Sequence, residues 1–175
     1  MKTTLKFTIT VCLCLSIQKA SAQNIKDLDF LIGTWEVEET IYPGTDKEYK
    51  EKGIRTCSYF LNDAFIKCEA ITIVSTSGKE RHYGYYITWN HMDGFFQAVS
   101  LAHDFPRPGI HQWYLDKEKK IITFVTPKNV LGDRFIRGTI SYENPKQLIW
   151  QGWWSKYNED KDWEQIFRDV ATRRE

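Results

Sequence analysis

The side chains with the most chemical capacity flank a proline-rich segment. His103 and Asp104 precede the segment 105–110 (Phe-Pro-Arg-Pro-Gly-Ile), and His111 follows it. Two prolines and a glycine oppose regular ladder pairing, so we predict a stiff loop between the two histidines, at one end of the fold. Imidazole and carboxylate groups can bind metals, but this spacing matches no established zinc signature. We therefore expect no metal site here.

Acid–base catalysis would require one titratable group held in a dry cavity. Glu39 lies in an alternating segment and shares a face with Trp35. If that face points inward, Glu39 is a buried acid that needs a partner, for which Arg55 and Arg137 are candidates. If the protein is an enzyme of the isomerase or lyase kind, we expect Glu39 and His103 to carry the reaction. We favour a non-enzymatic role.

Signatures of two other chemistries are missing from the sequence. It has no G-x-S-x-G nucleophile elbow and no glycine-rich, phosphate-binding loop before a helix. Four serines in strand-like or turn segments have no base near them in sequence: Ser58, Ser75, Ser100 and Ser155. Neither serine hydrolysis nor nucleotide binding is therefore predicted.

Aromatic residues make up 15% of the chain, and some of them could line a pocket for a flat or apolar ligand. The alternative is that the rings simply fill the interior of the fold. For a pocket, we predict ligand contacts from Arg55, Tyr85, Trp89, His103 and Trp113, and we expect no cofactor. The predicted partner is one small apolar or aromatic molecule.

A tryptophan pair offers a different kind of partner. In Trp153-Trp154, strand alternation sends one ring inward and the other outward. An outward ring beside Trp150 and Trp163 would leave an apolar patch. Such a patch would suit a homodimer or an interaction module.

Cys57 and Cys68 flank a predicted hairpin that turns at Asn62-Asp63. A two-residue turn at this point places the two cysteines directly opposite each other, near the separation that a disulfide accepts. Either a disulfide or two small apolar thiols on one face of the sheet would fit this register.

Short runs of β-branched and aromatic residues, separated by Gly, Pro, Asn and Asp, indicate an antiparallel all-β domain. Sequential strands joined by such turns favour a single up-and-down β-barrel, which leaves no exposed sheet edge. A β-sandwich is the alternative. We predict about ten strands, near 34–42, 49–60, 65–74, 80–90, 94–102, 110–116, 120–126, 133–142, 147–156 and 162–170.

Residues 1–22 have the features of a secretory signal peptide: an early lysine pair, an apolar stretch at 7–17 and Ala20-Ser21-Ala22. Their removal takes away three lysines, which leaves 21 basic and 23 acidic residues. This balance gives no reason to expect nucleic acid or an anionic membrane as a partner, and we predict no membrane insertion. We expect export to the periplasm or beyond the cell, a barrel domain at 23–170 and a charged, frayed tail at 171–175.

The string Leu28-Asp29-Phe30-Leu31-Ile32-Gly33-Thr34-Trp35 resembles the opening of a group of bacterial lipocalin-like (calycin) domains, which begin with F-L-x-G-x-W. The Tyr42-Pro43 that follows is similar to nitrobindin-like haem proteins. The resemblance implies a barrel with an internal cavity and a short N-terminal helical turn that plugs one end. Gly33 and Trp35 would be structural residues of this plug.

The same resemblance implies a basic residue near the final strand that caps the motif tryptophan. Arg168 is the best match, and cation–π packing on Trp35 would be the physical reason. The nitrobindin pattern also includes a haem-binding histidine near the C-terminus, but this chain has no histidine after His111. We therefore expect no haem.

Overall fold

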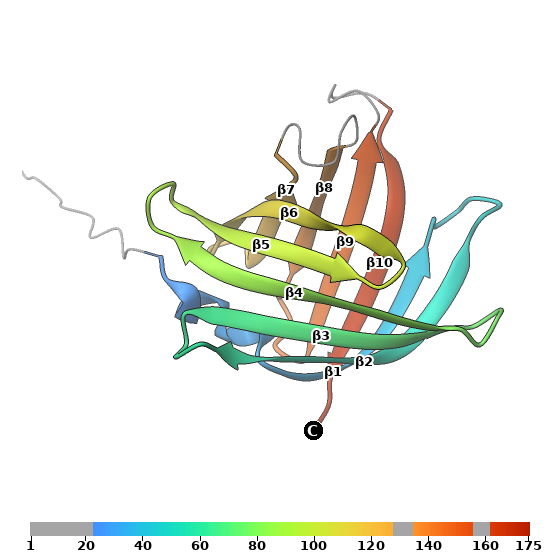
Figure 1. The fold of residues 1–175 in the computed structure, drawn as a ribbon, viewed down its shortest axis with the longest axis horizontal. Coiled ribbons are helices and arrows are strands. Elements are labelled where there is room, and N and C mark those ends of the chain that lie inside the picture. Colours follow the sequence, from blue (N-terminus) through green and yellow to red (C-terminus); the bar gives the residue numbers. More distant parts are fainter. Residues whose placement is uncertain (1–22, 128–134, 156–161) are drawn as a thin grey trace, which may run out of the picture.

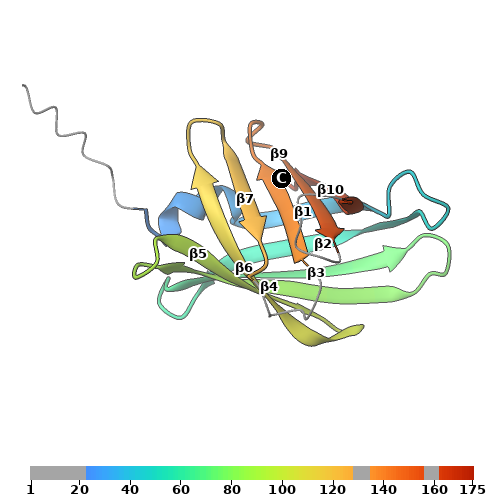
Figure 2. The ribbon, with the colours of Figure 1, turned by 90° about the horizontal axis from the view of Figure 1, so that it is seen from above.

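A computed structural model of the chain describes residues 23–127, 135–155 and 162–175. These residues form one short 3-10 helix and ten strands, each strand antiparallel to its neighbours. Pairing of the first strand with the last closes the sheet into a barrel (Figures 1 and 2). The elements are η1 Ile25–Leu31, β1 Gly33–Ile41, β2 Tyr49–Phe60, β3 Phe65–Val74, β4 Glu80–Asn90, β5 Phe95–Ala102, β6 Phe105–Asp116, β7 Ile121–Val125, β8 Phe135–Ser141, β9 Gln147–Ser155 and β10 Glu164–Arg173.

This topology confirms the predicted all-β, up-and-down barrel and its N-terminal helical turn, and it excludes the β-sandwich. In Figure 1, β3, β4 and β5 cross the view while β8, β9 and β10 run up it, as expected for a strongly twisted closed sheet. The predicted signal peptide, residues 1–22, lies outside the described residues. Within the described ranges, no helix has the length and apolar character needed to span a membrane.

The predicted stiff loop from 103 to 111 is wrong, because β6 begins at Phe105. β5 and β6 form a hairpin that turns at His103-Asp104. Its prolines are tolerated because the register is irregular there: Ser100 pairs with Gly109 and Ala102 with Phe105, which leaves 106–108 opposite one residue. Within the described residues, β7 pairs with β6 only from Gln112 onward, so this stretch also lies at an edge.

The C-terminal residues form a strand rather than the predicted frayed tail. β10 continues to Arg173, and the Ala171 side chain is fully buried. The cause is the register of barrel closure, in which Trp35 at the start of β1 pairs with Arg173 near the end of the chain. Residues 171–173 therefore belong to the barrel domain.

The helix η1 closes one end of the barrel. Asn24 caps its first turn, and Leu28 and Leu31 are buried. The indole N–H of Trp35 donates to the Leu31 carbonyl at 2.8 Å, which ties the first strand to the helix. Above this plug, large rings fill the interior: those of Trp35, Phe96, Trp113 and Trp150 are almost completely buried.

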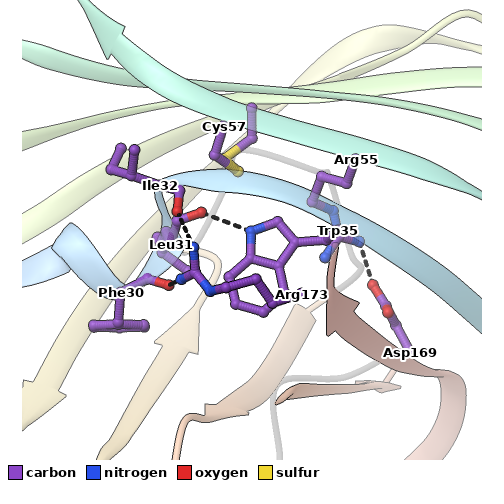
Figure 3. Close-up of a disulfide and its surroundings, with 9 residues drawn as sticks. Phe30, Leu31, Ile32, Trp35, Arg55, Cys57, Asp169 and Arg173 are labelled. Atoms are coloured by element: carbon purple, nitrogen blue, oxygen red, sulfur yellow. Dashed lines mark hydrogen bonds and ion pairs between the residues drawn. A yellow bond between two sulfur atoms is a disulfide. The ribbon is translucent and has the colours of Figure 1, made fainter. Parts of the chain in front are cut away.

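The basic residue on the motif tryptophan is Arg173, not Arg168. The Arg173 guanidinium lies 4.2 Å from the Trp35 ring centroid and donates to the carbonyls of Ile32 (2.7 Å) and Phe30 (3.0 Å) (Figure 3). Arg168 pairs with Thr40 near the other end of β1, where its side chain is exposed. The prediction of Arg168 was wrong because it relied on the family motif, whereas the antiparallel register of β1 and β10 places Arg173 opposite Trp35.

Gly33 is required by the same arrangement. Its φ of +129° is a conformation that residues with a side chain rarely adopt. A Cβ at this position would also lie 2.6 Å from the Arg173 guanidinium. The glycine of the G-x-W motif therefore makes room for the arginine that covers the tryptophan.

The β2–β3 hairpin has the predicted register. Leu61, Asn62 and Asp63 all adopt positive φ in the turn, and Cys57 pairs with Cys68. The structure joins the two sulfurs in a disulfide, buried on the inner face of the sheet near η1.

Candidate functional site

A cavity of about 870 Å³ opens at the end of the barrel opposite η1. Its wall comes from the ends of β1, β5 and β9 and from the first halves of β2, β4, β6, β8 and β10. Seven of its side chains are aromatic: Tyr42, Tyr49, Tyr83, Tyr85, Phe105, Trp154 and Phe167. The remainder are Glu39, Ile41, Arg81, Ser100, Leu101, Ala102, Asp104, Arg107, Gly109, His111, Ile136 and Ile166.

Strand alternation explains which residues reach the cavity. On β4, Arg81, Tyr83 and Tyr85 point inward at the open end, while Ile87 on the same face is buried deeper in the core. The Tyr85 ring lies on the core rings, 5.3 Å from that of Trp150 and 6.3 Å from that of Trp113. Tyr85 therefore marks the boundary between the packed half of the barrel and the hollow half.

Three carboxylates lie side by side across the inner wall. Glu39 on β1 pairs in register with Glu51 on β2 and, on its other side, with Asp169 on β10. All three residues are buried. Directly opposite residues of an antiparallel sheet have Cβ atoms about 4.5–5.5 Å apart, so these acids repel one another when ionised.

Two arginines neutralise the outer members of this row. Arg55 forms a fully buried ion pair with Asp169. Arg81 donates from Nη1 to Glu51 at 2.7 Å and from Nε to Asp104 at 3.0 Å. The Thr72 hydroxyl also donates to Glu51, at 2.7 Å. Glu51 and Asp169 thus each have a cationic partner.

Glu39, in the middle of the row, has a different partner. It accepts a hydrogen bond from the Tyr83 hydroxyl at 3.2 Å, and its residue is only 9% exposed. Burial, and then the charge of the adjacent Asp169, raises the pKa of Glu39 to about 7. The cavity wall therefore holds a carboxyl group that gains or loses a proton near neutral pH.

We predict that Glu39→Gln stabilises the protein at alkaline pH. The pKa of Glu39 is near 4.5 in the unfolded chain and about 7 in the fold, so between these values only the folded state keeps the proton. The free energy of unfolding should consequently fall as the pH rises through this window, by at most about 3 kcal/mol, and the loss persists above it. Glutamine removes this loss. Urea unfolding between about pH 5 and pH 8 measures it.

Glu51→Gln is the matched comparison and should have the opposite effect. The Glu51 carboxylate accepts from Arg81 with one oxygen and from Thr72 with the other. Glutamine keeps one acceptor and puts an NH2 donor in place of the other, so one of these donors loses its partner and Arg81 loses a compensating charge. If Glu39→Gln and Glu51→Gln both destabilise the protein at alkaline pH, Glu39 does not carry the unfavourable charge.

A polar chain lies on the opposite wall of the cavity. Ser100 Oγ is 3.0 Å from His111 Nε2, and His111 Nδ1 is 3.1 Å from the Thr126 hydroxyl. Burial lowers the pKa of His111 to about 4, so the ring is neutral at physiological pH. A neutral ring between two hydroxyls can donate and accept hydrogen bonds, but it is a weak base. The sequence does not show this contact between Ser100 and His111, because the two residues are 11 positions apart.

The structure distributes the five predicted ligand contacts over four regions. Tyr85 lines the cavity. Arg55 lies beneath the wall, with its guanidinium 4.5 Å from the Trp150 ring centroid. Trp89 and Trp113 pack in the core, near Phe96 and Trp150 respectively, and the described cavity wall includes neither.

His103 also lies away from the cavity. It stands in the exposed β5–β6 turn, where its Nδ1 accepts from the His82 backbone N–H at 2.9 Å. Because His111 points into the barrel, the two histidines that flank the proline segment do not meet. Among the described residues, no group of three His, Cys, Asp or Glu side chains is arranged to hold a metal ion.

The predicted outward tryptophan patch is not formed as expected. Trp150 is buried and Trp154 lines the cavity, while Trp153 and Trp163 are only half-buried. The Arg137 guanidinium lies 4.0 Å from the Trp163 ring centroid. Arg137 therefore lies on the outer face of the barrel and is not the partner of Glu39.

Sequence reasoning missed Glu51, Arg81, Ser100 and Asp169. Glu51 could have been found, because alternation from the inward Cys57 also turns residues 55, 53 and 51 inward. The position of Asp169 beside Glu39 could not be predicted in this way, because it depends on the register in which β10 pairs with β1.

Comparison with known proteins gives the fold. No family model and no curated protein matches this chain. Among solved structures, an S-type phycobiliprotein lyase, CPES from Guillardia theta, has a TM-score of 0.63 and 7% identity over 87% of this chain and 94% of that chain. Rv2717c from M. tuberculosis has a TM-score of 0.59 and 9% identity over 86% of this chain and 97% of that chain. The chain is thus similar to these barrels and has a calycin-like, ten-stranded fold.

Proposed function

We propose that this protein binds one small apolar or aromatic molecule in the cavity at the open end of the barrel. The observation that carries this proposal is the cavity itself, with about 870 Å³ of space and seven aromatic side chains on its wall. Pockets for small ligands commonly enclose roughly 300–1,000 Å³ and combine apolar walls with a few polar groups. Here Glu39, Arg81, Ser100 and His111 supply the polar groups.

We propose further that the protein is exported. Residues 1–22 carry the signal-peptide pattern, and the buried Cys57–Cys68 disulfide suits an oxidising compartment. An exported binding protein would meet its ligand outside the cytoplasm, as a carrier or a sensor.

The test uses N-phenyl-1-naphthylamine, an uncharged dye that fluoresces in apolar surroundings. Wild-type protein should bind it at one site per chain. Ala102→Trp places a large ring on the cavity wall and should weaken dye binding at least tenfold. Ile73→Trp introduces the same ring on the exposed outer face of β3 and should leave binding unchanged.

Equal dye binding by wild type and Ala102→Trp would contradict the proposal, because the dye would then occupy another surface. Native mass spectrometry of protein purified from its own compartment would add the mass of the natural ligand, as an adduct that is lost on denaturation.

A second candidate function, acid–base catalysis, has one observation in its favour. Glu39 lines the cavity, and its pKa of about 7 suits a general acid or base. In that case Glu39→Gln would abolish turnover of the molecule found by mass spectrometry and leave dye binding intact. Unchanged recovery of that molecule after incubation with wild-type protein would favour the carrier.

A further inference from the structure

On the inner wall of the barrel, as far as the structure describes it, buried acids outnumber the arginines that face them by one. Three buried acids form the row Glu51, Glu39 and Asp169, and two arginines, Arg55 and Arg81, face them. The rim acid Asp104 also shares Arg81. The other ionisable groups that the structure describes near this wall are the hydroxyls of Tyr42, Tyr49, Tyr83 and Tyr85, none of which supplies a positive charge. The ionised row is therefore short of one cation.

Among the described residues, Glu39 is the acid of this row that lacks a cationic partner. Asp169 has Arg55, and Glu51 has Arg81 and Thr72. Within the described residues, the one hydrogen bond to the Glu39 carboxyl group comes from the Tyr83 hydroxyl. An ionised carboxylate that is nine-tenths buried is unfavourable unless a proton or a cation compensates it. Glu39 also lines the cavity, so a bound molecule can reach it.

Among the described residues, no buried cation beside Glu39 is left for an anionic ligand. Arg55 lies below the cavity and pairs with Asp169, and Arg81 is shared by two carboxylates. Arg107 also lines the cavity, but it is exposed. A ligand carboxylate near Glu39 would add a fourth acid to the row. A cation would instead lie among tyrosine rings, whose faces attract positive charge.

We infer that the ligand of the cavity carries a protonated nitrogen, such as an amine or amidine on an aromatic body, which pairs with the Glu39 carboxylate. This inference rests on the proposed function and specifies its ligand class. The nitrogen would replace the proton that Glu39 otherwise holds. The flat body of the ligand would lie between Tyr85, at the bottom of the cavity, and Phe167, nearer its mouth.

Three probes with one aromatic body test the inference. 2-Naphthamidine is a cation, 2-naphthamide is its neutral isostere and 2-naphthoate is the anion. Displacement of N-phenyl-1-naphthylamine at about pH 8, where Glu39 is ionised, gives the three affinities. A hydrogen bond between charged groups predicts that the amidine binds about tenfold to a hundredfold more tightly than the amide.

The decisive variant is Glu39→Gln, which should bring the amidine and the amide to within about threefold of each other. Glu38→Gln is its matched control, because Glu38 is the adjacent residue, points outward and pairs with Lys52. This control should keep the full preference for the amidine.

The outcomes separate the inference from the function on which it rests. If wild type binds amidine and amide equally, or prefers the naphthoate, while Ala102→Trp still blocks the dye, the cation inference is overturned and the binding function stands. If dye binding does not respond to Ala102→Trp, both are overturned. If Glu39→Gln and Glu38→Gln lose the preference alike, general surface charge and not Glu39 is responsible, which also overturns the inference.

Discussion

Arg55→Met is expected to lower the free energy of unfolding by about 3–5 kcal/mol. The guanidinium is fully buried, pairs with Asp169 and lies against the Trp150 ring. Methionine keeps much of the side-chain volume but leaves the Asp169 carboxylate buried without a cation and beside Glu39. The penalty therefore comes from an uncompensated charge more than from lost packing. Urea unfolding at about pH 8 measures it.

Asp169→Asn should cost clearly less than Arg55→Met, although both break the same ion pair. Removing the arginine leaves three buried acids facing one arginine, whereas removing the aspartate leaves two acids and two arginines. In Asp169→Asn, the remaining carboxylate of Glu39 can compensate Arg55, whose charge already acts to lower the pKa of Glu39. Equal destabilisation by the two variants would show that the charge balance of the row is unimportant.

The pH dependence adds a second readout for Arg55→Met. Without the arginine, Asp169 and Glu39 both favour protonation in the fold, so the variant should recover stability as the pH falls from about 8 to 5. Lys52→Met is the surface control on the same strand. Its partner Glu38 is solvent-exposed, so this change should leave stability nearly unchanged at either pH.

The strands were predictable because their signals are local. Turn residues such as Asn62-Asp63 set the β2–β3 register, including the opposed cysteines. The wrong prediction of a loop at β6 also came from a local signal. Two prolines in six residues favour a loop on local grounds, but an edge stretch with an irregular register accommodates them in a strand.

The candidate site was less predictable because its position depends on depth along the barrel axis. Alternation turns Tyr85 and Trp113 inward equally, but only the location of η1 decides that Trp113 is packed and Tyr85 borders the cavity. The acid row requires the register of β1 with both β2 and β10, and the second of these pairings joins the two ends of the chain. No short-range pattern contains that information.

Trp35→Ala is expected to destabilise the protein by about 3–5 kcal/mol, the usual range for deleting a buried tryptophan side chain. The ring is fully buried between the plug and the core, and its indole N–H holds the Leu31 carbonyl. The cavity left behind would separate η1 from β1. Chemical denaturation should show the loss, and hydrogen exchange should show earlier opening of the η1 amides.

Arg173→Met should reproduce part of this effect, and its comparison with Arg168→Met decides between the two arginines. Arg173 donates to the carbonyls of Phe30 and Ile32 and covers Trp35, so its loss should cost about 1–3 kcal/mol and speed exchange in η1. Arg168→Met changes an exposed side chain and should stay within about 0.5 kcal/mol of wild type. The Arg173 cost should shrink when Trp35 is already alanine, because part of it is the contact between the two. If Arg168→Met proves the more damaging change, the plug is not held by the register that joins Trp35 to Arg173.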